Sequence, residues 1–94
     1  MSGDVTRYIV TIKFKEETLT ELNELNNHLT RAGFTLTLSD DEGKVHEPGT
    51  NSFGLITLQS VEEIKELVVG LANTAIGKPV EVEVITFEQW LKDQ

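Results

Sequence analysis

Two histidines, His28 and His46, are the side chains in this sequence best suited to acid–base chemistry. Histidine titrates near neutral pH, so either ring could take a proton from a substrate. The chain has no cysteine, which excludes disulfides, thiol catalysis and cysteine-bound metal ions. The histidines are far apart in the sequence, and neither has another histidine at a metal-ligand spacing. Each is therefore either a surface residue or a candidate general base.

Carboxylates gather in the segment 40–53, DDEGKVHEPGTNSF, which also contains His46. Residues 40–42 are all acidic, and carboxylate oxygens are ligands that calcium and magnesium prefer. Their spacing is not that of an EF-hand loop, and three consecutive side chains diverge on an extended chain. Residues 41–44 and 48–49 instead have the composition of turns. We therefore predict a solvent-exposed hairpin tip and no metal site.

Three of the eight Lys and Arg residues fall on one face of a predicted strand at 7–15, namely Arg7, Lys13 and Lys15. Such a row could form a phosphate-binding stripe. Alternatively, Glu81 and Glu83 of the last predicted strand neighbour the row and neutralise it. The net charge of −8 disfavours nonspecific attraction to nucleic acid, so a polyanionic partner would need a local cluster of cations.

Hydrophobic periodicity and capping signals predict the elements that position these residues. Strands are predicted at 7–15, 34–39, 52–58 and 80–85, helices at 19–32 and 61–75, and a last short helix after Thr86. Capping boxes at 18–21 and 60–63 begin the two long helices. The order β-α-β-β-α-β predicts an α+β, ferredoxin-like fold. In that fold, two helices cover one face of a four-stranded antiparallel sheet, with the first and third strands in the centre.

Length and composition predict one domain over residues 1–94, with a flexible start at 1–6. No apolar run is long enough to span a membrane or to form the core of a signal peptide. The absence of cysteine fits a reducing compartment. We therefore expect a cytoplasmic protein.

The open face, which is the side of the sheet away from the helices, is expected to carry an apolar patch. The even-numbered residues of strand 7–15 should face the helices, which places Ile9 on the open face. Strand 52–58 is apolar on both faces, so one of its apolar pairs must also lie there. Either a homodimer formed through this face or a cover from the tail carrying Phe87 and Trp90 would bury the patch. Base stacking of the RNA-recognition type is disfavoured, because only Phe53 offers an aromatic ring on the central strands.

A set of residues between 7 and 92 occurs in the register of a known family. The matching positions are Tyr8-Ile-Val10, Leu22, Leu25, Leu29, Gly33-Phe34, Asp40-Asp-Glu-Gly43, Asn51-Ser-Phe53, Glu63-Ile64, Leu67, Val84-Ile-Thr86 and Trp90. Together they resemble the GhoS family of endoribonuclease antitoxins, which belong to type V toxin–antitoxin systems. Most of these positions indicate a shared fold, and the Asn51-Ser-Phe53 string after an acidic-glycine turn is the most specific match.

The resemblance implies a ferredoxin-like protein that cleaves the messenger RNA of a membrane-damaging toxin and does not bind the toxin protein. In that family, function is tied to a basic residue in the first helix and to the phenylalanine of the Asn-Ser-Phe string. The phenylalanine corresponds to Phe53. The basic position falls on Asn26, and His28 and Arg31 are the nearest basic side chains on that helix.

The chemistry implied by the resemblance needs neither a metal ion nor a cofactor. A general base, His28 or His46, would activate the ribose 2′-hydroxyl, and a cation would stabilise the transition state. The residues expected to bind RNA are Arg7, Lys13, Arg31 and Phe53. The fold also allows a non-catalytic module that dimerises, or binds a protein partner, through the open face.

Overall fold

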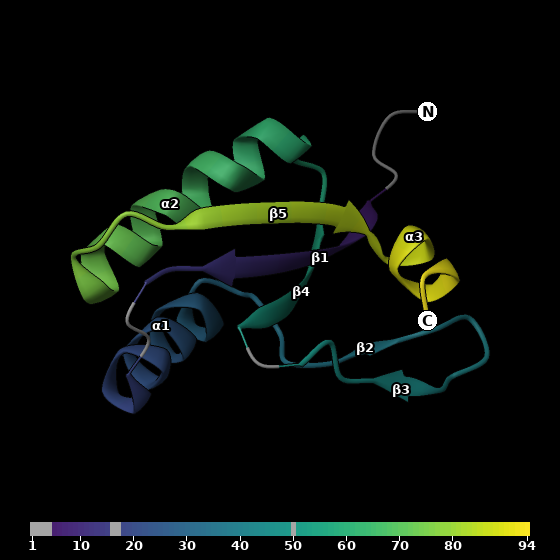
Figure 1. Ribbon diagram of the computed structural model, residues 1–94. Coiled ribbons are helices and arrows are strands. Elements are labelled where there is room, and N and C mark those ends of the chain that lie inside the picture. Colours follow the sequence, from purple (N-terminus) through teal and green to yellow (C-terminus); the bar gives the residue numbers. More distant parts are fainter. Residues whose placement is uncertain (1–4, 16–17, 50) are drawn as a thin grey trace.

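The computed structural model describes residues 5–15, 18–49 and 51–94 (Figure 1). The elements are β1 (Thr6–Lys13), α1 (Leu19–Arg31), β2 (Leu38–Ser39), β3 (Val45–His46), β4 (Ser52–Thr57), α2 (Val61–Ile76), β5 (Glu81–Thr86) and α3 (Phe87–Lys92). The first four residues of the start that we expect to be flexible lie outside the described residues. No helix in the described part of the chain is long and apolar enough to cross a lipid bilayer.

A three-stranded antiparallel sheet, in the order β4-β1-β5, forms the centre of the fold. Tyr8 of β1 lies opposite Leu55 of β4 and Thr86 of β5. Each helix begins at a side chain that caps it, because Thr18 and Ser60 accept the backbone N–H of the residue three positions later. The α+β class, the two long helices and the short C-terminal helix are confirmed.

The prediction of a four-stranded sheet is wrong, because the segment 34–39 leaves the sheet after one residue. Thr35 and Gly54 form an isolated bridge, in which each backbone N–H donates to the other residue's carbonyl at 2.8 and 2.7 Å. The Thr35 hydroxyl then donates to the carbonyl of Thr37 at 2.8 Å, which bends the chain away. Leu38 and Ser39 pair instead with β3 in a separate two-stranded hairpin. β4 is therefore an edge strand that carries a single bridge on its outer side.

The main core lies between the sheet and the two long helices. Its buried side chains come from the even positions of β1, from α1 and α2, and from Phe34, Phe53 and Leu55. Val10, Ile12, Leu29 and Val68 are completely buried. Burial of an aliphatic side chain of this size contributes about 1.5–3 kcal/mol to the free energy of unfolding. The predicted alternation of β1 is confirmed.

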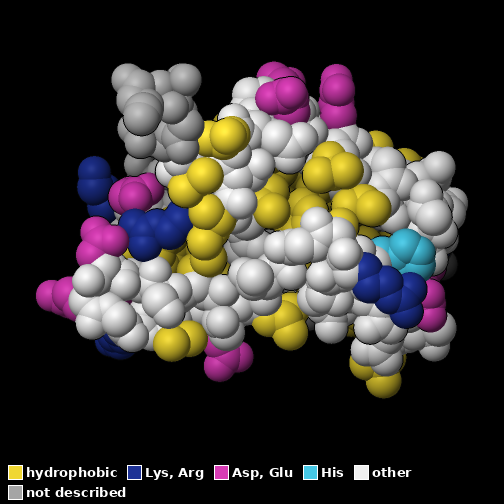
Figure 2. Space-filling view, turned by 180° about the vertical axis from the view of Figure 1, so that it is seen from behind, with side chains coloured by type: hydrophobic (Ala, Val, Ile, Leu, Met, Phe, Trp, Pro, Cys, Tyr) yellow, Lys and Arg dark blue, Asp and Glu magenta, His cyan; other side chains and the backbone are white. Residues whose placement is uncertain are grey.

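A second, smaller core covers one end of the open face. Ile9 of β1, Leu38 of the hairpin and Phe87 of α3 are buried together, and Trp90 packs against them. The expectation of a bare open face is therefore wrong at this end, where the chain supplies its own cover, and the alternative of a cover from the tail is confirmed. Hydrophobic side chains also gather on the rear surface, with acidic and basic groups mostly toward its edges (Figure 2).

Candidate functional site

The turn of the β2–β3 hairpin is built around the side chain of Asp40. Its Oδ1 accepts the backbone N–H groups of Glu42 and Lys44, both at 2.9 Å. The Asp40 backbone N–H also donates to the carbonyl of Lys44 at 2.9 Å. A carboxylate that holds two N–H groups in this way stabilises a tight turn. The predicted hairpin tip is confirmed.

The same carboxylate holds the ring of His46. Asp40 Oδ2 lies 2.9 Å from His46 Nε2, and the two side chains are only 16% and 18% exposed. The imidazole packs edge-on against Phe87 and Trp90, with ring centroids 5.7 Å from each. Phe87 and Trp90 are themselves stacked, at 5.9 Å. The orientation of the His46 ring is thus fixed by one hydrogen bond and two aromatic contacts.

The hydrogen bond with His46 lowers the pKa of Asp40, and the backbone N–H groups of Lys44 and Glu42 lower it further. Asp40 is therefore ionised at neutral pH and can only accept hydrogen bonds. Consequently Nε2 of His46 carries a hydrogen, and in the neutral ring the lone pair lies on Nδ1. No described residue forms a hydrogen bond with Nδ1. This arrangement leaves Nδ1 as the nitrogen that can accept a proton.

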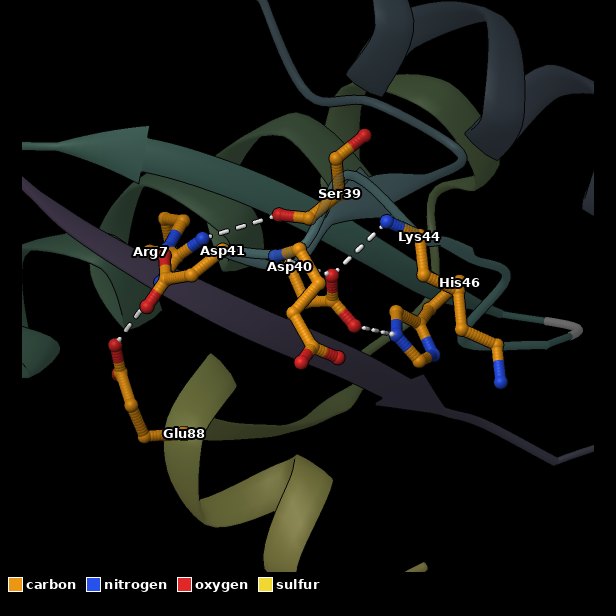
Figure 3. A network of polar contacts seen from close by, with 8 residues as sticks. Arg7, Ser39, Asp40, Asp41, Lys44, His46 and Glu88 are labelled. Carbon is orange, nitrogen blue, oxygen red and sulfur yellow. Dashed lines mark hydrogen bonds and ion pairs between the residues drawn. The ribbon is translucent and has the colours of Figure 1, made fainter.

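Arg7 joins the hairpin and α3 to β1 (Figure 3). Its guanidinium donates to the carbonyl of Ser39 at 3.0 Å and to the carboxylates of Asp41 and Glu88, each at 3.2 Å. It also lies 5.1 Å from the centre of the Phe87 ring, which His46 contacts as well. We call this group of side chains the Arg7–His46 cluster, which comprises Arg7, Asp40, Asp41, His46, Phe87, Glu88 and Trp90.

The ion pairs of Arg7 are weak enough for a substrate to replace them. The side chains of Asp41 and Glu88 are 90% and 60% exposed. Exposed pairs of this kind contribute about 0–1 kcal/mol, because water solvates both partners well. A phosphate oxygen could therefore take the place of either carboxylate, whereas the bond to the Ser39 carbonyl would keep the guanidinium in position.

Lys13, the second predicted RNA-binding cation, lies far from Arg7. The two residues are about 20 Å apart along β1, at roughly 3.3 Å per residue. Lys13 lies opposite Glu81 and Thr11 opposite Glu83. In the described part of the chain, no ion pair joins Lys13 to either glutamate. Lys13 instead lines a cavity of about 610 Å³ with Lys15 and Lys78, so the predicted stripe is divided between two ends of the sheet.

The remaining predicted residues lie on or beside α1. His28 makes one local contact, from its Nδ1 to the carbonyl of Glu24 at 3.0 Å, and Arg31 is exposed. α1 packs on the helix-covered face, whereas His46 belongs to the opposite face. The structure therefore does not bring His28 and His46 together. Catalytic roles for either histidine, and an RNA-binding role for Arg31, stay predictions.

Phe53 is a core side chain with only 3% of its surface exposed. Its ring is not available for base stacking in this structure. It lines a groove of about 260 Å³ together with Asn26, Asn51 and Ser52. We call this depression the Asn26 groove. Asn26, at the position of the family's basic helix residue, and the Asn51-Ser-Phe53 string therefore line the same groove. The role of Phe53 toward RNA stays a prediction.

Sequence reasoning did not find the partnership of Asp40 with His46, or the part played by Phe87 and Trp90 beside them. A signal was present, because the predicted turn lies between Asp40 and His46, so a hairpin brings these two side chains toward each other. No three His, Asp or Glu side chains among the described residues are grouped so that they could hold a metal ion.

Comparison with known proteins identifies the family to which this chain is similar. The model of the family described as "Endoribonuclease GhoS" matches residues 1–93. A protein of Escherichia coli strain K12, described as "Uncharacterized protein YdiZ", is 60% identical over 89 residues, which cover 95% of this chain and 93% of the relative. The protein of the same description from Escherichia coli O157:H7 matches equally well.

Proposed function

We propose that this chain, which belongs to the endoribonuclease GhoS family, cleaves single-stranded RNA at the Arg7–His46 cluster. The observation that carries the choice of site is the 2.9 Å contact between Asp40 Oδ2 and His46 Nε2. It supplies a histidine whose tautomer and orientation are set by an ionised carboxylate. His28, the other histidine, has only a backbone carbonyl as a partner among the described residues.

His46 acts as the general base in this scheme. Its Nδ1 takes the proton of a ribose 2′-hydroxyl, and the 2′-oxygen attacks the adjacent phosphorus. The bond from phosphorus to the 5′-oxygen of the next nucleotide breaks, and that oxygen leaves with a proton from the imidazolium or from water. The products are a cyclic 2′,3′-phosphate and a free 5′-hydroxyl. Asp40 is a positioning residue that stabilises the imidazolium.

Arg7 binds the scissile phosphate. The guanidinium offers planar, bidentate hydrogen bonds that match phosphate oxygens, and it stabilises the charge that develops in the transition state. Asp41 and Glu88 occupy it in the free protein and are displaced by the substrate. Because the chain carries a net charge of −8, binding should rest on this local contact. It should weaken only modestly with added salt, because few phosphates are neutralised.

The biological setting that we infer is that of the family. The substrate is a messenger RNA, specifically that of a toxin whose production the protein prevents, and the protein acts as an antitoxin in the cytoplasm. Lys13 and Arg31 would contact the RNA backbone at a distance from the cluster. These assignments extend the family resemblance to this chain.

A cleavage assay with matched histidine variants tests the proposal. A fluorescently labelled single-stranded RNA is incubated with the wild type, His46→Ala, Asp40→Asn and His28→Ala. We expect His46→Ala to lower the rate by about 10²–10⁴-fold, the range for loss of a general base. His28→Ala should cut like the wild type, and a 2′-deoxy substrate should resist cleavage. Full activity of His46→Ala would overturn the assignment.

A second candidate function is self-association through the open face. Ile56 of β4 and Leu58, which directly follows β4, are 54% and 66% exposed, and Ile56 lies opposite Arg7 of β1. Exposed apolar pairs of this size favour a partner. We infer a weak homodimer at this edge, and sedimentation equilibrium of the wild type beside Leu58→Ser tests it. A wild-type monomer at millimolar concentration would refute the dimer.

A further inference from the structure

We propose that the Asn26 groove holds one unpaired base of the RNA substrate, an inference that rests on the proposed function and names a subsite for it. The groove lies between the first turns of α1 and residues 49 and 51–53. Its walls combine apolar side chains with side-chain amides, including Leu22, Leu36, Phe53, Asn23, Asn26 and Asn51.

Asn26, one of the residues that line the groove, carries an unsatisfied acceptor. Oδ1 of Asn26 is buried and has no hydrogen-bond partner among the described residues. Buried polar atoms almost always have a partner, so an orphan of this kind calls for a donor from a ligand. The N–H groups on the pairing edge of a nucleobase are such donors, and the side-chain N–H of an asparagine can donate back to an adjacent acceptor of the base.

The lining selects a neutral ring over a phosphate. None of the described residues that line the groove is charged. A phosphate placed there would lose its hydration without meeting a cation. Leu22 and Leu36 supply apolar surface for the faces of a ring. At about 260 Å³ the groove is smaller than the pockets of drug-sized ligands, which fits one base and no longer segment.

The groove is linked to the proposed catalytic histidine by a short stretch of backbone. Gly49 lines the groove and lies three residues after His46. Three residues of extended chain span at most about 11 Å. An RNA strand held in the groove would pass around the edge strand β4 to reach the Arg7–His46 cluster, because α1 lines the groove and the cluster lies on the opposite face. Unpaired bases are the usual targets of RNA-binding proteins, because only they expose the pairing edge.

Binding of an uncleavable RNA, measured by fluorescence anisotropy, tests the subsite. The probes are a labelled 2′-O-methyl oligonucleotide of mixed sequence, about 12 residues long, and an abasic oligomer of the same length. We expect Asn26→Leu to weaken binding of the first probe by about tenfold or more, through loss of a buried hydrogen bond, and to leave the abasic probe unchanged. Asn27→Leu is the matched control, because Asn27 is exposed on the same helix and does not line the groove.

A measurement on the wild type removes any dependence on variant folding. The side-chain amide resonances of Asn26 should shift when the base-bearing probe is added and stay in place with the abasic probe. The subsite would be refuted if these resonances do not move, or if Asn26→Leu weakens the binding of both probes equally. Binding through Asn26 without any cleavage would refute only the proposed function, and cleavage that ignores Asn26 would refute only the subsite.

Discussion

Replacing Gly54 by alanine should loosen the hairpin from the sheet. A Cβ atom at this position would lie 2.5 Å from Cγ of Leu38, 2.8 Å from Oγ1 of Thr35 and 3.0 Å from Cδ1 of Leu38. Leu38 is 5% exposed and packs with Ile9 and Phe87, so it has no free space to enter. The backbone of Gly54 cannot retreat easily, because it is bonded to Thr35 on one side and paired with β1 on the other.

Overpacking of this kind costs about 1–3 kcal/mol of the free energy of unfolding. In a domain of this size each kcal/mol lowers Tm by about 4–8 °C. Gly70→Ala is the matched control, since Gly70 is exposed within α2 and a Cβ there meets nothing within 4 Å. That substitution should raise stability by about 0.5–1 kcal/mol, because glycine is a poor helix former.

Urea denaturation followed by two signals distinguishes local from global effects. Trp90, the single tryptophan, packs against His46 and Phe87 and reports on the hairpin and α3. Far-UV circular dichroism reports on the helices. Removing the opposing side chain in Gly54→Ala/Leu38→Ala should cost less than the sum of the two single changes. Additive costs, or a Gly54→Ala protein as stable as the wild type, would refute the argument that Leu38 rests on Gly54.

Two further predictions concern charges. Asp41→Asn removes one of the two carboxylates that pair with Arg7. RNA affinity at low salt should therefore rise by about two- to fivefold, which is the scale of one exposed ion pair. An unchanged affinity in an anisotropy titration would contradict this prediction. Hydrogen bonds from His46 and from Lys78 lower the pKa of Asp40 and of Glu21, respectively. These groups stabilise the protein above the ordinary carboxyl pKa of about 4 and lose that effect as the pH falls through their lower folded values. Tm measured from pH 6 to pH 2 should therefore fall less steeply in Asp40→Asn, and identical slopes would exclude the Asp40 contribution.

The sequence predicts the main sheet and helices well, because their signals are local and redundant. Residues 7–15 alternate cleanly, and the caps at Thr18 and Ser60 mark helix starts that the structure reproduces. The predicted strand at 34–39 does not join the main sheet, for a tertiary reason. Phe34, Leu36 and Leu38 also alternate, but the Thr35–Thr37 hydrogen bond turns the chain and leaves Leu36 51% exposed. No period-two pattern contains that information.

The candidate site was predicted only in its parts. Arg7 and His46 could be chosen by residue type, yet their meeting depends on how the hairpin folds back over Ile9, which is a long-range event. The pairing of Asp40 with His46 required the exact geometry of the turn. Asn26 stands at the position of the family's basic helix residue, whereas its unsatisfied oxygen can be recognised only from its burial in the folded structure.

The hairpin that carries Asp40 and His46 is attached to the sheet by one backbone bridge and a few side chains. Its two strands have two residues each, far below the length at which a hairpin is stable alone. This segment can therefore detach while the sheet and the long helices stay folded. Its backbone amides should exchange with heavy water by local opening, well before those of β1. Warming would then abolish activity at a temperature where most of the molecule still has its native shape.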